Sequence, residues 1–186
     1  MSEVRAVRKL WAPGIARLAL RARGDVHGIV VHRIEVSQED ASFTDAPEDV
    51  VRFFREHPIG LQATSGDMPY PVLVTREGEL VQTVPLSRVT PHARSYNPST
   101  IGVGCIGDFR REAPTQRQRE ALLAVCAGLL ATLGVGPEGL HSHDSLHGGS
   151  HDPDKICPGP NLSIAQLKDD VARLLATGAP RLELDW

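Results

Sequence analysis

Apolar and polar residues follow one another along the chain in patterns that predict both strands and helices. A β-branched run that opens at Gly28 is typical of a buried strand. Two further apolar runs, 71–75 and 79–84, flank the turn Arg76-Glu77-Gly78 and predict an antiparallel hairpin. A fourth strand is expected over 100–107, where three glycines indicate close backbone approach to a packed helix or to a ligand. Packing against a helix is the preferred interpretation.

Three segments carry apolar residues at helical spacing between signals that start and stop helices. The first, 45–58, begins with the capping-box spacing of Asp45-Ala-Pro-Glu48, and Pro58 ends it. Two longer helices are expected over 115–134 and 163–178, each started by Thr or Ser and ended by Gly. Together these elements predict an α/β fold: a single domain in which a central mixed β-sheet is flanked by helices.

Residues 140–162 lack the periodicity of a helix or a strand. This stretch holds four of the eight histidines, three aspartates, one lysine and one of the three cysteines. A structureless loop of this length is usually functional or disordered. We interpret it as the functional site.

Charge and cysteine content exclude several classes of protein. The 20 basic and 23 acidic side chains give a formal net charge of −3, which does not favour binding to the phosphates of a nucleic acid. Three widely spaced cysteines fit free thiols in a reducing compartment. The longest apolar stretch, 121–135, is too short for a membrane span, and no apolar run near the N-terminus fits a signal peptide. We expect a monomer that stays cytoplasmic before any release and does not insert into membranes.

Cys157, His143 and His32 could together hold a zinc ion. Imidazole and thiolate are preferred ligands of Zn²⁺, and catalytic zinc keeps three protein ligands. Prolines fix the backbone directly after Cys157. The second ligand would be His143 or a neighbouring histidine, and the third would be His32, from a strand elsewhere in the chain. Because these ligands bind deprotonated, affinity should weaken below about pH 6. The alternative is a cysteine hydrolase in which His143 activates Cys157, but zinc also accounts for His32.

Six segments carry a resemblance to a known family. They are Val31-His32, Pro69-Tyr70 before the hairpin, His92 to Asn97 followed by Ile101-Gly-Val-Gly, Pro114-Thr-Gln-Arg-Gln118, His143-Asp144 and Lys155-Ile-Cys-Pro-Gly-Pro160. In this order they resemble the zinc-dependent N-acetylmuramoyl-L-alanine amidases, which share the fold of the peptidoglycan recognition proteins and include phage lysozyme-amidases. The resemblance runs from about Gly28 to Val171. It implies an N-terminal extension packed on or preceding the domain (1–27), an amidase domain (28–178) and a C-terminal tail (179–186).

The resemblance also implies a role for each matched residue. By position, the zinc ligands are His32, His143 and Cys157, the catalytic residues are Tyr70 and Lys155, and the substrate-binding residues are His92 and Asn97. Lys155 matches the lysine that stabilises charge on the scissile amide oxygen, and Tyr70 matches a tyrosine kept close to the zinc and its water. Three features depart from the family pattern: Pro71 follows this tyrosine, Ser142 precedes the second histidine, and the stretch from His143 to Lys155 is longer. Because further histidines lie close to His143 in the sequence, His141 is the next choice of ligand.

The implied function is zinc-dependent hydrolysis of the amide bond between N-acetylmuramic acid and the L-alanine of the stem peptide. The partner is then peptidoglycan or muropeptides, and a phage or prophage endolysin fits the expected absence of a signal peptide. Two alternatives are a cytoplasmic amidase that recycles muropeptides and a non-catalytic peptidoglycan-binding module with a structural zinc. Members that only recognise peptidoglycan commonly lose the cysteine or other ligands. All these positions are filled here, which favours an enzyme.

Overall fold

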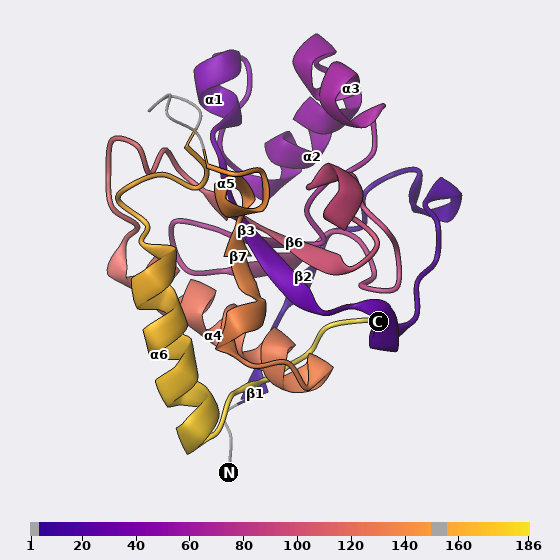
Figure 1. The fold of residues 1–186 in the computed structure, drawn as a ribbon. Helices are drawn as coiled ribbons and strands as arrows, with labels where there is room; N and C mark the ends of the chain where they lie inside the picture. The colour runs from indigo at the N-terminus through magenta and orange to yellow at the C-terminus, as the bar shows by residue number, and fades with distance from the viewer. Residues whose placement is uncertain (1–3, 150–155) are drawn as a thin grey trace.

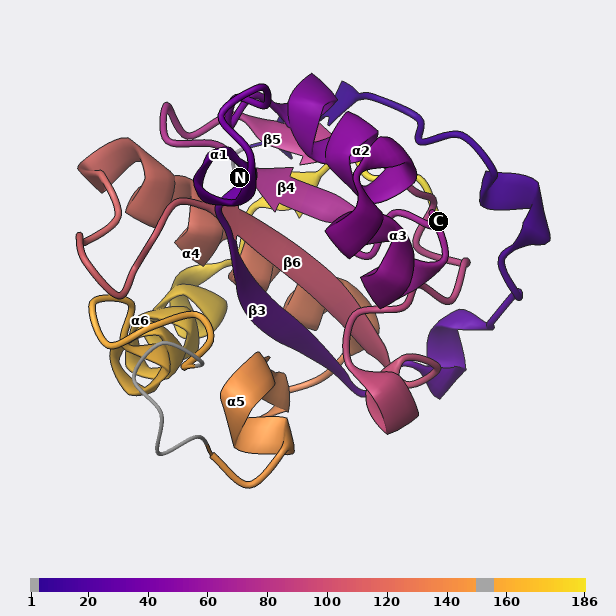
Figure 2. The ribbon, with the colours of Figure 1, turned by 90° about the horizontal axis from the view of Figure 1, so that it is seen from above.

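The computed structural model describes residues 4–149 and 156–186. Six strands form one mixed sheet in the order β2-β5-β4-β6-β3-β7 (Figures 1 and 2). Their bounds are Arg8–Lys9 for β2, Gly28–Ile34 for β3, Val72–Val74 for β4, Leu80–Gln82 for β5, Thr100–Ile106 for β6 and Leu140–Ser142 for β7. Neighbouring strands are parallel except in the hairpin of β4 and β5. The predicted mixed sheet and hairpin are confirmed.

Helices cover both faces of this sheet, with α1, α2 and α3 on one side and α4 and α6 on the other (Figure 1). The α-helices are α1 (Val36–Glu39), α2 (Pro47–Glu56), α3 (Pro58–Thr64), α4 (Gln116–Leu133), α5 (His143–Leu146) and α6 (Ile164–Thr177). Short 3-10 turns lie at Ile15–Arg17, Arg23–Asp25, Arg94–Tyr96 and Pro137–Gly139. None of the described helices combines the length and apolar character that crossing a bilayer requires.

Side chains along the central strands alternate between two cores. On β3, Ile29 and Val31 pack into the core under α4 and α6, whereas Ile34 packs into the core under α2. Successive residues of a strand point to opposite faces. His32 therefore faces the side of the sheet that α2 and α3 cover, and it does so from a strand buried on both faces.

The two long helices begin as predicted, but the first helix does not. Thr115 and Ser163 are N-caps, and their side-chain oxygens accept hydrogen bonds from backbone N–H groups three residues later. The expected capping box at Asp45 is wrong, because Ala46 is the N-cap of α2 and the Asp45 carboxylate accepts from the Ser37 N–H instead. Pro58 ends that helix as expected and also begins the unexpected α3.

The stretch 140–162 is not structureless in its described part. Its first residues form β7, which pairs with β3 in parallel, and α5 follows directly. The register aligns Ile29 with Leu140 and Val31 with Ser142. This pairing brings the histidine-rich stretch to the carboxyl end of the strand that carries His32.

Both chain ends attach to the sheet through Gln82 on β5. The Gln82 side chain accepts hydrogen bonds from Lys9 Nζ (2.6 Å) and the Asp185 N–H (2.8 Å), and donates to the Asp185 carbonyl (2.7 Å). Strand β1 (Val4–Arg5) also pairs with β8 (Arg181–Leu182) in a separate two-stranded sheet. The described parts of the expected extension and tail therefore contact each other and the domain.

Candidate metal centre

Three potential metal ligands from distant parts of the sequence meet at one point. The ligand atoms of His32, His143 and Cys157 all lie within 4.8 Å of one another. His32 stands near the end of β3, and His143 is the first residue of α5, directly after β7. The parallel pairing of β3 and β7 brings their carboxyl ends to the same edge of the sheet. His141 is not part of this cluster.

Local hydrogen bonds fix the segments that carry His143 and Cys157. The Ser142 hydroxyl caps α5 by accepting from the Ser145 N–H at 3.0 Å. The Asp144 N–H donates to the Cys157 carbonyl at 3.2 Å, which ties α5 to the cysteine segment. The two ligands are thus held relative to each other by backbone contacts.

The glycines of β6 make room for the rings around this cluster. A Cβ at Gly102 would lie 2.8 Å from His92 Cγ, and one at Gly104 would lie 2.9 Å from Tyr70 Cγ and 2.3 Å from Ile34 Cδ1. The glycines of this strand were expected to let a packed helix approach the backbone closely. The structure corrects this interpretation, since the groups packed on these two glycines are side chains, two of them rings of the candidate site.

We predict that Gly104→Val destabilises the protein by about 1–3 kcal/mol, because the added Cβ alone would overlap Ile34 and Tyr70. Denaturant unfolding measures this loss. Gly24→Ala is the matched control, since a Cβ there meets nothing within 4 Å. Equal stability of the Gly104 and Gly24 variants would contradict the packing described here.

A cavity of about 310 Å³ opens beside the three ligands. Its described lining consists of His32, Phe54, Ala63, Thr64, Pro69, Tyr70, Pro91, His92, Arg94, Asn97, His143 and Cys157. The two residues expected to bind substrate thus border it, although Asn97 is also engaged in holding the loop. Its side-chain oxygen accepts from the N–H groups of His92 (3.0 Å) and Ala93 (2.6 Å). Substrate contact by His92 and Asn97 stays a prediction.

Tyr70 lines the cavity between His32 and Phe54. Its ring centroid is 5.0 Å from that of His32 and 5.7 Å from that of Phe54. Burial, reinforced by Cys157, raises the pKa of the Tyr70 hydroxyl, which therefore stays protonated at neutral pH. Lys155, the other expected catalytic residue, lies outside the described residues.

Burial sets the protonation of the ligands. It lowers the pKa of His32 well below the usual value, helped by the neighbouring His92 and His143, and it also lowers the pKa of His143. Both imidazoles are therefore neutral at neutral pH. Burial raises the pKa of Cys157 to about 11, although Arg33 acts in the opposite direction. A protonated thiol is a poor nucleophile, and it must also lose its proton to bind a metal, so it is the third potential ligand, His32, that favours metal binding over cysteine catalysis.

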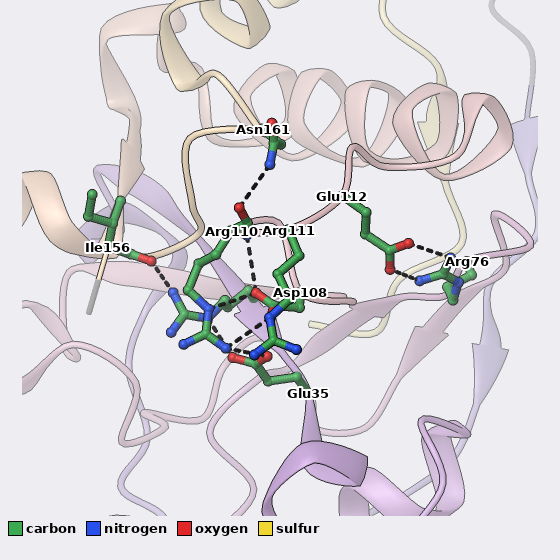
Figure 3. A network of polar contacts seen from close by, with 9 residues as sticks. Glu35, Arg76, Asp108, Arg110, Arg111, Glu112, Ile156 and Asn161 are labelled. Carbon is green, nitrogen blue, oxygen red and sulfur yellow. Dashed lines mark hydrogen bonds and ion pairs between the residues drawn. The ribbon is translucent and has the colours of Figure 1, made fainter. Parts of the chain in front are cut away.

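No sequence pattern indicated the ion-pair network that reaches Ile156, the residue before Cys157 (Figure 3). Glu35 contacts Arg33 and Arg110 at 2.7 Å each, and Arg110 also pairs with Asp108 at 2.7 Å. Arg33 donates to the carbonyl of Ile156, the residue before the cysteine. The network therefore connects the end of β3 to the segment that carries the third ligand. Glu35 and Arg110 are 75 positions apart, so no local pattern could reveal their pairing.

The fold and the cluster together define an α/β protein with a candidate metal centre at the carboxyl ends of two parallel strands. The model of the N-acetylmuramoyl-L-alanine amidase family matches residues 22–160. The chain belongs to this family, as the resemblance implied.

Solved structures share this fold. LysCS, an endolysin N-acetylmuramoyl-L-alanine amidase from Clostridium intestinale URNW, superposes on this chain with a TM-score of 0.65 at 20% identity. The superposition covers 92% of this chain and 96% of that chain. The Ph2119 endolysin from a Thermus scotoductus bacteriophage has a TM-score of 0.64 at 23% identity, covering 90% and 99%. Drosophila PGRP-LB has a TM-score of 0.60 at 18% identity, covering 88% and 92%. A comparison with curated proteins finds no match.

Proposed function

We propose that this protein is a zinc-dependent amidase that hydrolyses the amide bond between N-acetylmuramic acid and the L-alanine of the stem peptide. The observation that carries the proposal is the convergence of His32, His143 and Cys157 beside a cavity, in a chain of the amidase family. Peptidoglycan or its muropeptides are then the substrate. Tyr70 stands next to His32 of the ligand cluster, which favours catalysis over a binding module.

The donor set fits zinc. Two imidazoles and one thiol are the ligand types that Zn²⁺ prefers, and three protein ligands leave a further coordination position open. Both imidazoles are held neutral by burial, as metal binding requires. When bound, zinc polarises a carbonyl oxygen and lowers the pKa of a coordinated water toward about 7.

The chain's own residues would orient the substrate and stabilise charge. Hydrolysis breaks the amide C–N bond, leaving a carboxylate on the lactyl group and a free amino group on L-alanine. The protonated Tyr70 hydroxyl can donate a hydrogen bond to the reacting oxygen, and Lys155, placed by its resemblance to the family's lysine, would be the cation that balances negative charge there. Phe54, Ala63 and the two prolines give the cavity the apolar part of its lining.

Tyr70→Phe should lower kcat by about 10- to 100-fold, since one hydrogen-bond donor to the reacting oxygen is lost. Zinc content should not change, because the three proposed ligands, His32, His143 and Cys157, are all retained. Steady-state kinetics and metal analysis measure the two effects. Tyr96→Phe, at an exposed position, is the control with wild-type activity. Wild-type turnover in Tyr70→Phe would remove the hydroxyl from the mechanism.

The pH dependence of zinc affinity should follow Cys157. With a pKa of about 11, the thiol is protonated around neutrality and must release its proton on binding. The lowered pKa values of His32 and His143 mean that the imidazoles release none there. Apparent affinity should thus rise about tenfold per pH unit between about pH 6 and pH 9.

Competition with a chelating dye over this pH range measures the slope. Burial lowers the pKa of both imidazoles, so their contribution to the loss of affinity should appear at a lower pH than the value of about 6 expected for ordinary imidazoles. An affinity independent of pH would mean that the cysteine is already a thiolate without metal, contrary to this electrostatic description.

Release of new L-alanine amino termini tests the proposed activity. We expect release by the zinc-loaded protein, loss with a strong chelator and recovery when Zn²⁺ is added. A peptidoglycan-binding module would bind cell walls without releasing amino termini. A cysteine hydrolase would survive chelation and lose activity on thiol alkylation. Either pattern would refute the proposal.

We further propose an endolysin role, which the similarity to two endolysins supports. Intact sacculi and soluble muropeptides, supplied at equal concentrations of cleavable bonds, separate this role from recycling. An endolysin should solubilise sacculi. Activity confined to small soluble muropeptides would favour a recycling amidase instead.

A further inference from the structure

His92 contacts the proposed metal ligand His32 directly. The His92 side chain is buried, and its Nδ1 lies 3.2 Å from His32 Nε2. On the other side of the ring, Nε2 lies 3.3 Å from the Thr100 carbonyl oxygen. The ring thus bridges a backbone carbonyl and the ligand.

Hydrogen-bond chemistry assigns the protons in this series. A carbonyl oxygen only accepts, so His92 Nε2 carries the proton, and Nδ1 of the neutral ring is an acceptor. The Thr100 hydroxyl, 3.4 Å from the same Nε2, gives its proton to the Tyr96 carbonyl at 2.7 Å and cannot reverse this assignment. His32 Nε2 must then be the donor to His92. The remaining lone pair of the His32 ring is on Nδ1.

We propose that His92 is a positioning residue that fixes His32 as the Nε2–H tautomer and so presents Nδ1 to the metal. Ligating histidines usually donate their second ring N–H to a fixed acceptor, which sets the tautomer and the ring orientation. Here the acceptor is another imidazole. The metal-binding part of this inference rests on the proposed zinc function, whereas the tautomer exists without metal.

Several contacts fix His92 itself. Its backbone N–H donates to the Asn97 side chain, and the absence of a side chain at Gly102 lets the ring lie close to β6. Arg21 Nη1 donates to the carbonyls of Thr100 (2.5 Å) and Asn97 (2.9 Å). Arg21 precedes the family match at 22–160. The N-terminal region therefore supports the series of hydrogen bonds that ends at His32.

Long-range nitrogen–proton NMR of the isotope-labelled, metal-free protein tests the tautomer. A His32→Gln variant assigns the His32 signals among the eight histidines. We expect His32 to carry its proton on Nε2. A proton on Nδ1 in the wild-type protein would overturn the proposal, whatever the variants show.

Two variants test the effect on metal binding. His92→Leu removes the acceptor and should weaken zinc affinity by about 10- to 100-fold, with the His32 signals becoming a mixture of tautomers. His92→Asn offers an oxygen near the position of Nδ1 and should restore the single tautomer and most of the affinity. Circular dichroism checks that both variants fold. If His92→Leu does not fold, the tautomer of the wild-type protein and the zinc affinity of His92→Asn test the proposal.

The outcomes separate this inference from the proposed function. Wild-type affinity and a single Nε2–H tautomer in His92→Leu would overturn the positioning role. Failure of the wild-type protein to bind one zinc ion would instead refute the zinc function and with it the metal-binding part of the inference, while leaving the tautomer as measured.

Discussion

Cys157→Ser and His32→Ala should each remove the zinc ion and reduce amide hydrolysis to background. Each residue is one of the three ligands that we propose among the described residues, and a serine hydroxyl does not replace a thiolate as a zinc ligand. Metal analysis after dialysis and the amino-terminus assay measure the two losses.

Histidine variants provide the controls for this prediction. The His147 ring centroid lies 4.8 Å from that of His143, but His147 is not in the ligand cluster, so His147→Ala should keep its zinc. His143→Ala should lose it, whereas His141→Ala should retain it. Stoichiometric zinc in both the Cys157 and His32 variants would show that the metal site lies elsewhere.

Lys155→Ala should lower kcat by about 100- to 1000-fold without loss of zinc, as removal of one preorganised oxyanion donor does in other enzymes. The side chains nearest the cluster are uncharged, so a separate cation is needed to stabilise negative charge on the reacting oxygen. His32 and His92 are kept neutral by burial, and Tyr70 stays protonated. None of these groups neutralises an oxyanion by itself. Kinetics at saturating substrate measure the effect.

Arg94→Gln is the informative comparison for this lysine. Arg94 is the one permanently charged side chain among the described residues that line the cavity, and it lies exposed at the rim. We expect a smaller loss of kcat than in Lys155→Ala. A larger loss in the arginine variant, together with an active lysine variant, would transfer the charge-stabilising role to Arg94.

The regular elements were predictable because their signals are local. The β-branched run of β3 and the apolar face of α6 lie within single windows of sequence, and Thr115 and Ser163 cap their own helices. Asp45 has the same local spacing but bonds to the backbone of Ser37 instead, a tertiary contact that spacing does not encode. Strand β7 was missed because it has three residues and its partner, β3, lies more than a hundred positions earlier.

The candidate site was predictable in its residue types more than in its arrangement. The donor chemistry of His32, His143 and Cys157 and their order along the chain pointed to a metal site, and the structure brings these three together. The hydrogen bond between His32 and His92 and the rings packed on Gly104 depend on how strands lie side by side. Sequence alone carries no signal for such contacts.

Digestion of purified peptidoglycan in heavy-oxygen water, followed by mass spectrometry, tests the central claim most directly. We expect one heavy oxygen in the lactyl carboxylate of N-acetylmuramic acid and a free amino terminus on L-alanine, with neither product formed by the Cys157→Ser variant. Heavy oxygen at a glycosidic or peptide-bond carbon instead, or no cleavage by protein that holds one zinc ion, would contradict the assignment as a muramoyl-L-alanine amidase.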